Sequence, residues 1–234
     1  MGFAVTFEST LTTAHLADAC LRVGVTPRSV PLRAVRAETR LFGRAIPVRH
    51  FGSVDIFLEA IDSASPGDVL VVDNDGRTDE ACIGDLVTIE ADKAGLGGIV
   101  IWGCHRDTAE IRAIGLPLFS LSATPLEPMR LDPRDDLAFE FANIADFTVT
   151  AGDYVLADDD GVLFLPSDRL DDLIREAESI RDVERLQAER VRGGVTLREQ
   201  LQFSTYLKRR ESDSGLTFRK HLQTLGGAIE EGFD

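Results

Sequence analysis

Residues 68–107 read DVLVVDNDGRTDEACIGDLVTIEADKAGLGGIVIWGCHRD, and two hydrophobic periodicities alternate along them. The β-branched run at 68–73 is typical of a buried strand, and the polar stretch at 74–81 is typical of a turn. Apolar residues spaced three and four apart then predict a helix from Gly84, with Gly95 just past its end. GGIVIWG predicts a second buried strand. This alternation indicates βαβ units, in which neighbouring strands are parallel.

The alternation continues on both sides of this stretch. DTAEIRAIG, residues 107–115, predicts a short helix closed by Gly115, and LPLFSL predicts a third strand. Upstream, Thr13–Val23 predicts an amphipathic helix, and residues 32–51 carry strand-like pieces. The order of these elements predicts an α/β fold with parallel strands covered by helices.

The C-terminal part of the chain has a different pattern. Residues 147–166, FTVTAGDYVLADDDGVLFLP, predict a meander with Gly-Asp and Asp-Gly turns. A long helix is predicted from Ser167 to the Gly193-Gly194 pair, and the tail beyond it predicts two short helices. We therefore divide the chain into a main domain at residues 1–192 and a helical C-terminal extension at residues 193–234.

Composition limits the class of protein. The chain has 234 residues, and 44% of them are hydrophobic, which suffices for an ordinary core. The 25 basic and 40 acidic residues give a net charge of -15, which disfavours nucleic acid or an anionic membrane as a partner. No apolar run reaches the roughly 18 to 20 residues that span a bilayer. Three scattered cysteines argue against a disulfide framework, so a reducing, cytoplasmic setting is expected.

Several motifs of known chemistry are missing. The glycines of GLGGIVIWG precede a strand instead of following one, so the dinucleotide fingerprint is not met. Asp73-Asn74-Asp75-Gly76 and Asp158-Asp159-Asp160-Gly161 lack the spacing and distal Glu of a calcium loop, and we interpret both as solvated turns. Lys93 lies on an exposed helix face, which disfavours Schiff-base chemistry, and the histidines, His50 included, have no ligand-like spacing.

Charged residues stand at two predicted helix starts. Gly84-Asp85 begins the helix after the first strand, and Arg106-Asp107 follows the second strand. Residues just past the carboxyl ends of neighbouring parallel strands converge on one crevice. Free N–H groups at a helix start suit a carboxylate or phosphate, and Arg106 can hold a carboxylate or polarise a keto oxygen. Asp107 is a hard ligand for Mg²⁺ or Mn²⁺, so these residues suit a metal-chelated 2-oxo acid.

Asp107 has a second interpretation. It heads Asp-x-x-Glu, with Glu110 three residues on, which is a helix-capping pattern. Asp85 fits a first-turn acid favoured by the helix dipole, Gly84 a turn residue and Arg106 an ordinary surface residue. From spacing alone, this structural interpretation is the stronger of the two.

Longer stretches of the chain carry a family resemblance. The stretches are SPGDVLVVDNDG, ACIGDLV, GGIVIWGCHRD, Thr124-Pro125 after LPLFSLSA, and GDYVLADDDGVLFLP. They are similar to the RraA-like family, which includes class II pyruvate aldolases acting on 4-hydroxy-4-methyl-2-oxoglutarate and 4-carboxy-4-hydroxy-2-oxoadipate. The most specific element is an aldolase signature of an Asp, twenty residues and then Arg-Asp, met by Asp85, Arg106 and Asp107. Regulators of ribonuclease activity in this family can lack the metal-binding Asp, so Asp107 favours the enzymatic branch.

The resemblance implies a fold and an assembly. It covers roughly residues 10 to 190 and is weakest in the tail. It implies an α/β/β/α sandwich of the phosphohistidine-swivelling type, with a C-terminal helical extension in this chain. It also implies homotrimers or homohexamers with sites at subunit contacts. A Glu from a neighbouring subunit assists proton transfer in some members, and no position in this sequence can be matched to it.

The resemblance also implies residue roles. Arg106 would contact the pyruvyl group, and Asp107 would ligate a divalent cation, Mg²⁺ or Mn²⁺. The backbone of Gly84, Asp85, Leu86 and Val87 would hold the substrate carboxylate. Asp85 would orient a metal-bound water that removes the C4 hydroxyl proton. Arg106 and Asp85 are therefore the expected catalytic residues.

The expected activity is a metal-dependent retro-aldol cleavage. A 4-hydroxy-2-oxo di- or tricarboxylic acid would give pyruvate through a stabilised enolate. The same enolate arises when oxaloacetate loses CO₂, so decarboxylase side activity is expected. Two alternatives stay open: a non-catalytic regulator that binds a ribonuclease or another protein, and an enzyme with the same enolate chemistry but a different substrate.

Overall fold

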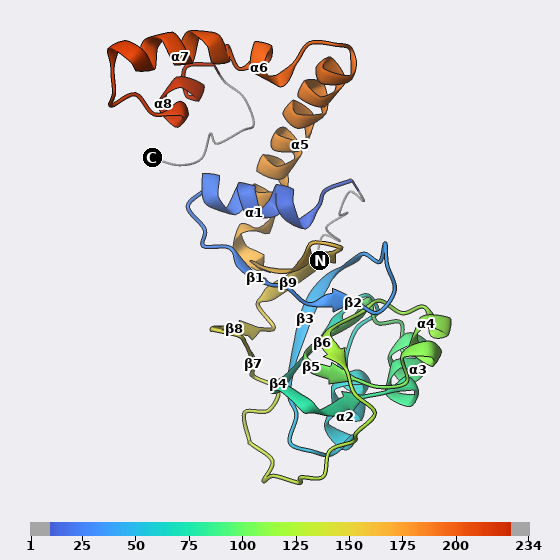
Figure 1. Ribbon diagram of the computed structural model, residues 1–234. Coiled ribbons are helices and arrows are strands. Elements are labelled where there is room, and N and C mark those ends of the chain that lie inside the picture. The colour runs from blue at the N-terminus through green and yellow to red at the C-terminus, as the bar shows by residue number, and fades with distance from the viewer. Residues whose placement is uncertain (1–9, 226–234) are drawn as a thin grey trace. The chain divides into compact units, whose positions relative to one another are not determined.

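The computed structural model describes residues 10–225 (Figure 1). By its internal contacts the chain divides into two compact units. The larger unit is residues 27–170, and the smaller one joins the segment before residue 27 to the segment from residue 171 onward. The predicted domain boundary after residue 192 rests on sequence resemblance and stays a prediction.

The larger unit is built on a mixed sheet. Eight strands follow the order β1-β10-β9-β3-β4-β5-β6-β2, and β7 and β8 form a separate hairpin. The strands are β1 (Arg28–Val30), β2 (Arg33–Ala34), β3 (Leu41–Arg49), β4 (Val69–Ile83), β5 (Gly98–His105), β6 (Leu118–Ala123), β7 (Phe141–Ile144), β8 (Phe147–Thr150), β9 (Asp153–Asp158) and β10 (Gly161–Pro166). The α-helices that lie wholly within this unit are α2 (Asp55–Ser63), α3 (Asp85–Lys93) and α4 (Thr108–Ile114). The predicted parallel strands are confirmed, because β3, β4, β5 and β6 pair parallel with one another.

Strand β3 joins the two halves of this sheet. Its first part pairs antiparallel with β9 from Leu41 to Arg44, and its second part pairs parallel with β4 from Ala45 to Arg49. Gly43 lies at this junction, where a Cβ atom would overlap the carbonyl oxygen of Gly67. Only glycine therefore allows the two chain segments to approach so closely.

Alternate side chains of β4 belong to two different cores. Val69 and Val71 pack with Phe164 and other side chains between the two halves of the sheet. Leu70 and Val72 point the opposite way and pack with Phe57 of α2 and apolar side chains of α3. Both faces of β4 are therefore buried, as in other sheets covered on both sides. The predicted sandwich of helices and sheet layers is confirmed.

The polar stretch at residues 74–81 is not the turn that its composition predicts. β4 continues through it to Ile83 and pairs with β5 through register shifts after Asp73. The Asp73 carboxylate accepts hydrogen bonds from the N–H groups of Asp75 at 2.9 Å and Asn143 at 3.0 Å. These bonds satisfy backbone groups beside the irregular ladder. The solvated-turn interpretation of Asp73 to Gly76 is therefore wrong, because Asp73 and Asn74 are buried.

The smaller unit is helical. Its helices are α1 (Thr13–Arg22), α5 (Leu170–Arg192), α6 (Leu197–Gln200), α7 (Phe203–Ser212) and α8 (Phe218–Leu222). Leu170, the first residue of α5, is counted with the larger unit. The predicted long helix starts with a 3₁₀ turn, η1 (Ser167–Arg169). Between residues 193 and 225 the tail carries three short helices instead of the predicted two. The His15 ring lies 3.1 Å from the Glu184 carboxylate of α5, and Phe203, Tyr206 and Phe218 pack their rings together.

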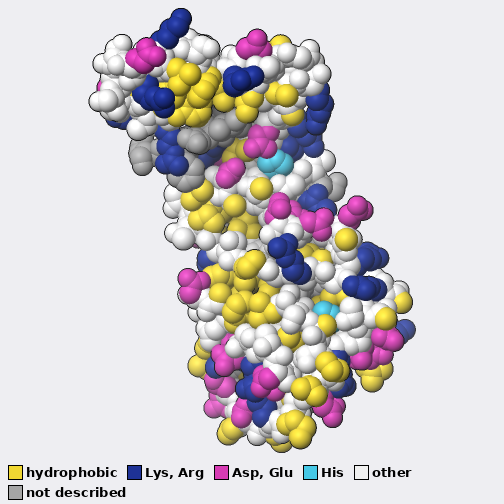
Figure 2. All heavy atoms as spheres, viewed as in Figure 1, with side chains coloured by type: hydrophobic (Ala, Val, Ile, Leu, Met, Phe, Trp, Pro, Cys, Tyr) yellow, Lys and Arg dark blue, Asp and Glu magenta, His cyan; other side chains and the backbone are white. Residues whose placement is uncertain are grey.

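The surface carries charges of both signs. Figure 2 shows acidic and basic side chains interspersed over the visible face of each unit. Many are paired, as Arg134 and Glu59 are at 2.6 Å. Within residues 10–225, no helix combines the length and the apolar character that crossing a bilayer requires.

We expect Leu70→Ala to lower the free energy of unfolding by about 2 to 5 kcal/mol, because it leaves a cavity beneath α2 and α3. Leu126→Ala is the matched control, since Leu126 is 60% exposed and its loss should cost about 0.5 kcal/mol or less. Urea unfolding monitored by circular dichroism measures both. Equal losses in the two variants would contradict the placement of Leu70 in the core.

Candidate functional site

The predicted site residues meet at one cavity in the larger unit. Ile83 at the end of β4 pairs with His105 at the end of β5, and the N–H of Arg106 donates to the Ile83 carbonyl at 3.0 Å. The residues that follow the two strands therefore lie at the same edge of the sheet. Gly84, Asp85, Leu86, Val87, Arg106 and Asp107 all line a cavity of about 330 Å³ at this edge.

Asp107 does not cap helix α4. Its backbone is left-handed, with φ 57° and ψ 44°, and its side chain makes no capping hydrogen bond. One carboxylate oxygen instead lies 3.4 Å from the amide nitrogen of Asp85 and 3.5 Å from Nε of Arg106. The capping interpretation is therefore wrong, because this backbone conformation directs the carboxylate toward the start of α3. A left-handed non-glycine residue costs about 1 kcal/mol, and such strain is concentrated at functional sites.

The start of α3 already attracts carboxylates. Asp85 accepts a hydrogen bond from the N–H of Leu86 at 2.7 Å, and Asp107 lies close to the N–H of Asp85. Gly84 allows this approach, since a Cβ atom there would overlap the Asp107 carboxylate and meet Cγ of Arg106 at 3.2 Å. The N-terminal end of α3, with the positive end of the helix dipole, therefore lies at the cavity, which suits a small anionic ligand.

Arg106 is held between two carboxylates. Its guanidinium lies 3.2 Å from Glu127 and 3.5 Å from Asp107, and its side chain is 39% exposed. Glu127 also lines the cavity, and no motif or spacing in the sequence had identified it as a site residue. It lies in the loop after β6, whose end reaches the same edge because the N–H of Thr124 donates to the His105 carbonyl.

Sequence reasoning also missed His50. It directly follows β3, the parallel neighbour of β4, and lines the same cavity. Its Nδ1 atom lies 2.8 Å from the side-chain oxygen of Asn74. Burial lowers the pKa of His50 below its ordinary 6.5. Its position after a parallel strand was the signal that could have identified it.

The residues of the cavity fit a hard divalent cation. Among the described residues there is no group of three or more His, Cys, Asp or Glu that could hold a metal ion. Such a cluster is needed for a structural zinc site, whereas Mg²⁺ takes one or two carboxylates and completes its shell with water and substrate oxygens. The Asp107 carboxylate is 37% exposed and is not committed to α4, so it suits that role.

Comparison with known proteins identifies the family. The RraA-like family model, described as Aldolase/RraA, matches residues 13–164. The chain belongs to the RraA-like family. A protein from Deinococcus radiodurans that is provisionally named 4-hydroxy-4-methyl-2-oxoglutarate aldolase is 33% identical to it over 135 residues, which are 57% of this chain and 82% of that protein.

Solved structures of other proteins share the fold. An uncharacterized protein from Pseudomonas syringae pv. tomato aligns with a TM-score of 0.72 and 26% identity, over 81% of this chain and 92% of that one. Streptomyces coelicolor RraAS2, described as an unusual member of the RNase ES inhibitor RraA protein family, aligns with a TM-score of 0.67. That alignment has 24% identity and covers 75% of this chain and 90% of that one, so it supports the fold alone. The predicted RraA-like fold is thereby confirmed.

We expect Gly84→Ala to weaken the binding of oxalate, used as a small dicarboxylate probe with Mg²⁺, by about tenfold or more. The added Cβ would displace the Asp107 carboxylate and crowd Arg106. Gly152→Ala is the control, because a Cβ there meets only the Thr150 hydroxyl at 3.4 Å. Isothermal titration calorimetry measures both, and unchanged oxalate affinity in Gly84→Ala would contradict the close approach.

Proposed function

We propose that this RraA-like protein is a divalent-metal-dependent aldolase. Its substrate would be a 4-hydroxy-2-oxo di- or tricarboxylic acid, and its reaction would release pyruvate. The orientation of Asp107 is the main support for this proposal. Its carboxylate does not cap α4 and instead lies beside Arg106 at the start of α3. The aldolase name of the Deinococcus radiodurans relative supports the same reaction class.

The residues of the cavity divide the work of binding. The backbone at the start of α3, Gly84 to Val87, receives the C1 carboxylate of the substrate, helped by the dipole of α3. Arg106 donates to the C2 oxygen, where negative charge grows as the C3–C4 bond breaks. A Mg²⁺ or Mn²⁺ ion held by Asp107 would supply positive charge that stabilises the developing pyruvate enolate. Lys93, which is exposed on α3, has no role in this chemistry.

Asp85 positions the polar groups around the substrate. Its hydrogen bond to the N–H of Leu86 fixes the carboxylate at the cavity wall. The other carboxylate oxygen remains available to orient a water molecule beside the substrate. Asp85 therefore acts on the reacting groups through water.

The same active site would decarboxylate oxaloacetate as a side reaction, since loss of CO₂ leaves the same pyruvate enolate. Assembly into a homotrimer or homohexamer is also proposed. Large apolar side chains near the cavity are exposed, with Leu86 at 76% and Met129 at 96%, which supports a subunit contact there. In the part of the chain that the structure describes, Cys20, Cys82 and Cys104 form no disulfide, which suits a reducing cytoplasm.

A non-catalytic regulator of a ribonuclease or another partner is the alternative. No feature of the cavity favours this alternative. A surface that only binds protein does not require the strained, left-handed backbone of Asp107 beside the start of α3. The two functions separate by experiment: pyruvate release from a 4-hydroxy-2-oxo acid supports the aldolase. Absence of pyruvate release and of metal uptake, with a stable protein partner, would support the regulator.

We expect Asp107→Asn to lower pyruvate release by more than about 100-fold, because an amide holds a divalent cation poorly. Its free energy of unfolding should change by less than about 0.5 kcal/mol, since Asn tolerates the left-handed backbone and no cap is lost. A lactate dehydrogenase-coupled assay with and without EDTA measures the activity. Activity that survives both EDTA and Asp107→Asn would sink the metal role.

We expect Arg106→Ala to lower kcat/KM for pyruvate release by about 100- to 1000-fold, because one charged donor to the growing oxyanion is lost. Arg175→Ala is the control, since the Arg175 side chain is 73% exposed on α5 and outside the larger unit. Steady-state kinetics of both variants with the same coupled assay measure the difference. Similar losses would show that Arg106 acts only through surface charge.

A further inference from the structure

The proposed cleavage needs a base, and most acidic groups of the cavity are already engaged. The C4 hydroxyl must lose its proton as the C3–C4 bond breaks. Asp107 is assigned to the cation, Asp85 is fixed by the N–H of Leu86, and Glu127 is paired with Arg106. Cys82 also lines the cavity, but burial raises the pKa of its thiol, which stays protonated near pH 7. The remaining titratable group at the cavity wall is His50.

The His50 ring is held in one orientation and one tautomer. It stacks on Phe57 with 5.1 Å between ring centroids and an angle of 18°. The side-chain oxygen of Asn74 faces Nδ1 at 2.8 Å and accepts a second hydrogen bond from Arg130 at 3.0 Å. Arg130 Nη2 also lies 3.4 Å from Nδ1, but the Asn74 oxygen is closer. This oxygen favours the proton of neutral His50 on Nδ1, which leaves a lone pair on Nε2.

The Nε2 atom is available for chemistry. Within residues 10–225 no protein group is hydrogen-bonded to it, and it is not among the sealed buried atoms that lack a partner. Solvent therefore reaches it, although the residue as a whole is only 9% exposed. Nδ1 faces Asn74 and Arg130, and His50 lines the site cavity, so Nε2 is the ring nitrogen left for a ligand there.

The charged groups around His50 favour its neutral form. Burial lowers the pKa of His50, and the Arg130 guanidinium lowers it further, whereas the Asn74 hydrogen bond and the carboxylates of Glu80 and Asp132 raise it. Glu80 and Asp132 are themselves paired with Arg130. The net effect keeps His50 unprotonated near pH 7, the form that a base needs.

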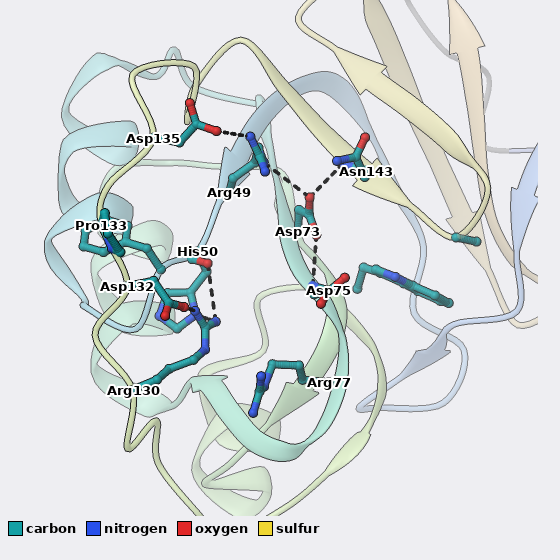
Figure 3. A pocket seen from close by; sticks show the side chains of 13 residues that line it. Arg49, His50, Asp73, Asp75, Arg77, Arg130, Asp132, Pro133, Asp135 and Asn143 are labelled. Atoms are coloured by element: carbon teal, nitrogen blue, oxygen red, sulfur yellow. Dashed lines mark hydrogen bonds and ion pairs between the residues drawn. The ribbon is translucent and has the colours of Figure 1, made fainter.

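His50 also lines a second cavity. It has a volume of about 420 Å³ and is lined by His50, Arg130 and several charged side chains (Figure 3). Two of its arginines are paired with carboxylates of the same cavity: Arg49 with Asp73 and Asp135, and Arg130 with Asp132. Arg130 contacts Asn74 as well, so this network helps to position His50.

We propose that His50 is the general base of the retro-aldol step. This inference rests on the proposed function. Nε2 takes the proton of the C4 hydroxyl, and the oxygen lone pair forms the C4 carbonyl. The C3–C4 bonding pair becomes the pyruvate enolate, which takes a proton at C3 from water. The protonated ring then returns its proton to solvent, so atoms and charge balance over one turnover.

His50→Gln tests the role with two substrates. We expect kcat for 4-hydroxy-4-methyl-2-oxoglutarate cleavage to fall by about 100- to 1000-fold. Oxaloacetate has no C4 hydroxyl, so its decarboxylation, and the affinity for oxalate, should change by less than about threefold. His15→Gln is the matched control, because His15 lies on α1 outside the larger unit. In this variant the rates of cleavage and of decarboxylation should both match those of the wild type.

Asn74→Asp tests the same role through pH. A carboxylate opposite Nδ1 stabilises the imidazolium and raises the pKa of His50. Activity is lost as pH falls through this pKa, so the acid limb of kcat should move to higher pH in Asn74→Asp. In the wild type the limb should lie below pH 6.5, the ordinary value. A merely structural role would leave the position of this limb unchanged.

The outcomes separate the two proposals. If the folded wild type releases pyruvate but His50→Gln cleaves the hydroxy acid normally, the assignment of His50 is overturned alone. Equal losses in cleavage and decarboxylation, or an acid limb that Asn74→Asp does not move, also overturn it. If the folded wild type with Mg²⁺ or Mn²⁺ releases no pyruvate from any 4-hydroxy-2-oxo acid, the proposed function fails and this assignment falls with it.

Discussion

The parallel pairing of β3, β4 and β5 is the constraint on which the site depends. Neighbouring parallel strands end at the same edge of the sheet, so the residues that directly follow them lie close together. His50 follows β3, Gly84 follows β4 and Arg106 follows β5. The cores on both faces of β4 hold these strand ends in register, because a slip of one residue would exchange the two buried faces. The chemistry of the cavity is thus built on the most buried part of the fold.

One backbone conformation then decides what Asp107 does. With an extended backbone, an Asp at the start of a helix caps that helix. In the left-handed conformation the same carboxylate faces the neighbouring helix start, where Gly84 leaves room for it. The strain is local, and the hydrogen bond from Arg106 to the Ile83 carbonyl holds the chain just before it. A capping pattern and a ligand position can therefore share one sequence.

The sequence predicted what depends on neighbouring residues. Periodicity located α3, β5, α4 and β6, and the glycines at 95 and 115 marked two helix ends. It failed where the deciding partner is distant: Asp73 looks like a turn residue until the N–H of Asn143 is placed against it. His50 likewise depends on Asn74 and Arg130. The left-handed backbone of Asp107 has no local signature, so only the family resemblance pointed away from capping.

The irregular end of β4 has a further consequence for how the protein can diverge. Glu80 is buried there and binds Arg130, which is one of the residues that anchor the loop after β6. On either side of that anchor, Met129 and Leu131 are exposed at 96% and 74%. Substitutions at such positions usually cost little stability. The loop can therefore vary in sequence through evolution while its attachment persists, which gives one scaffold a route to new substrates without refolding.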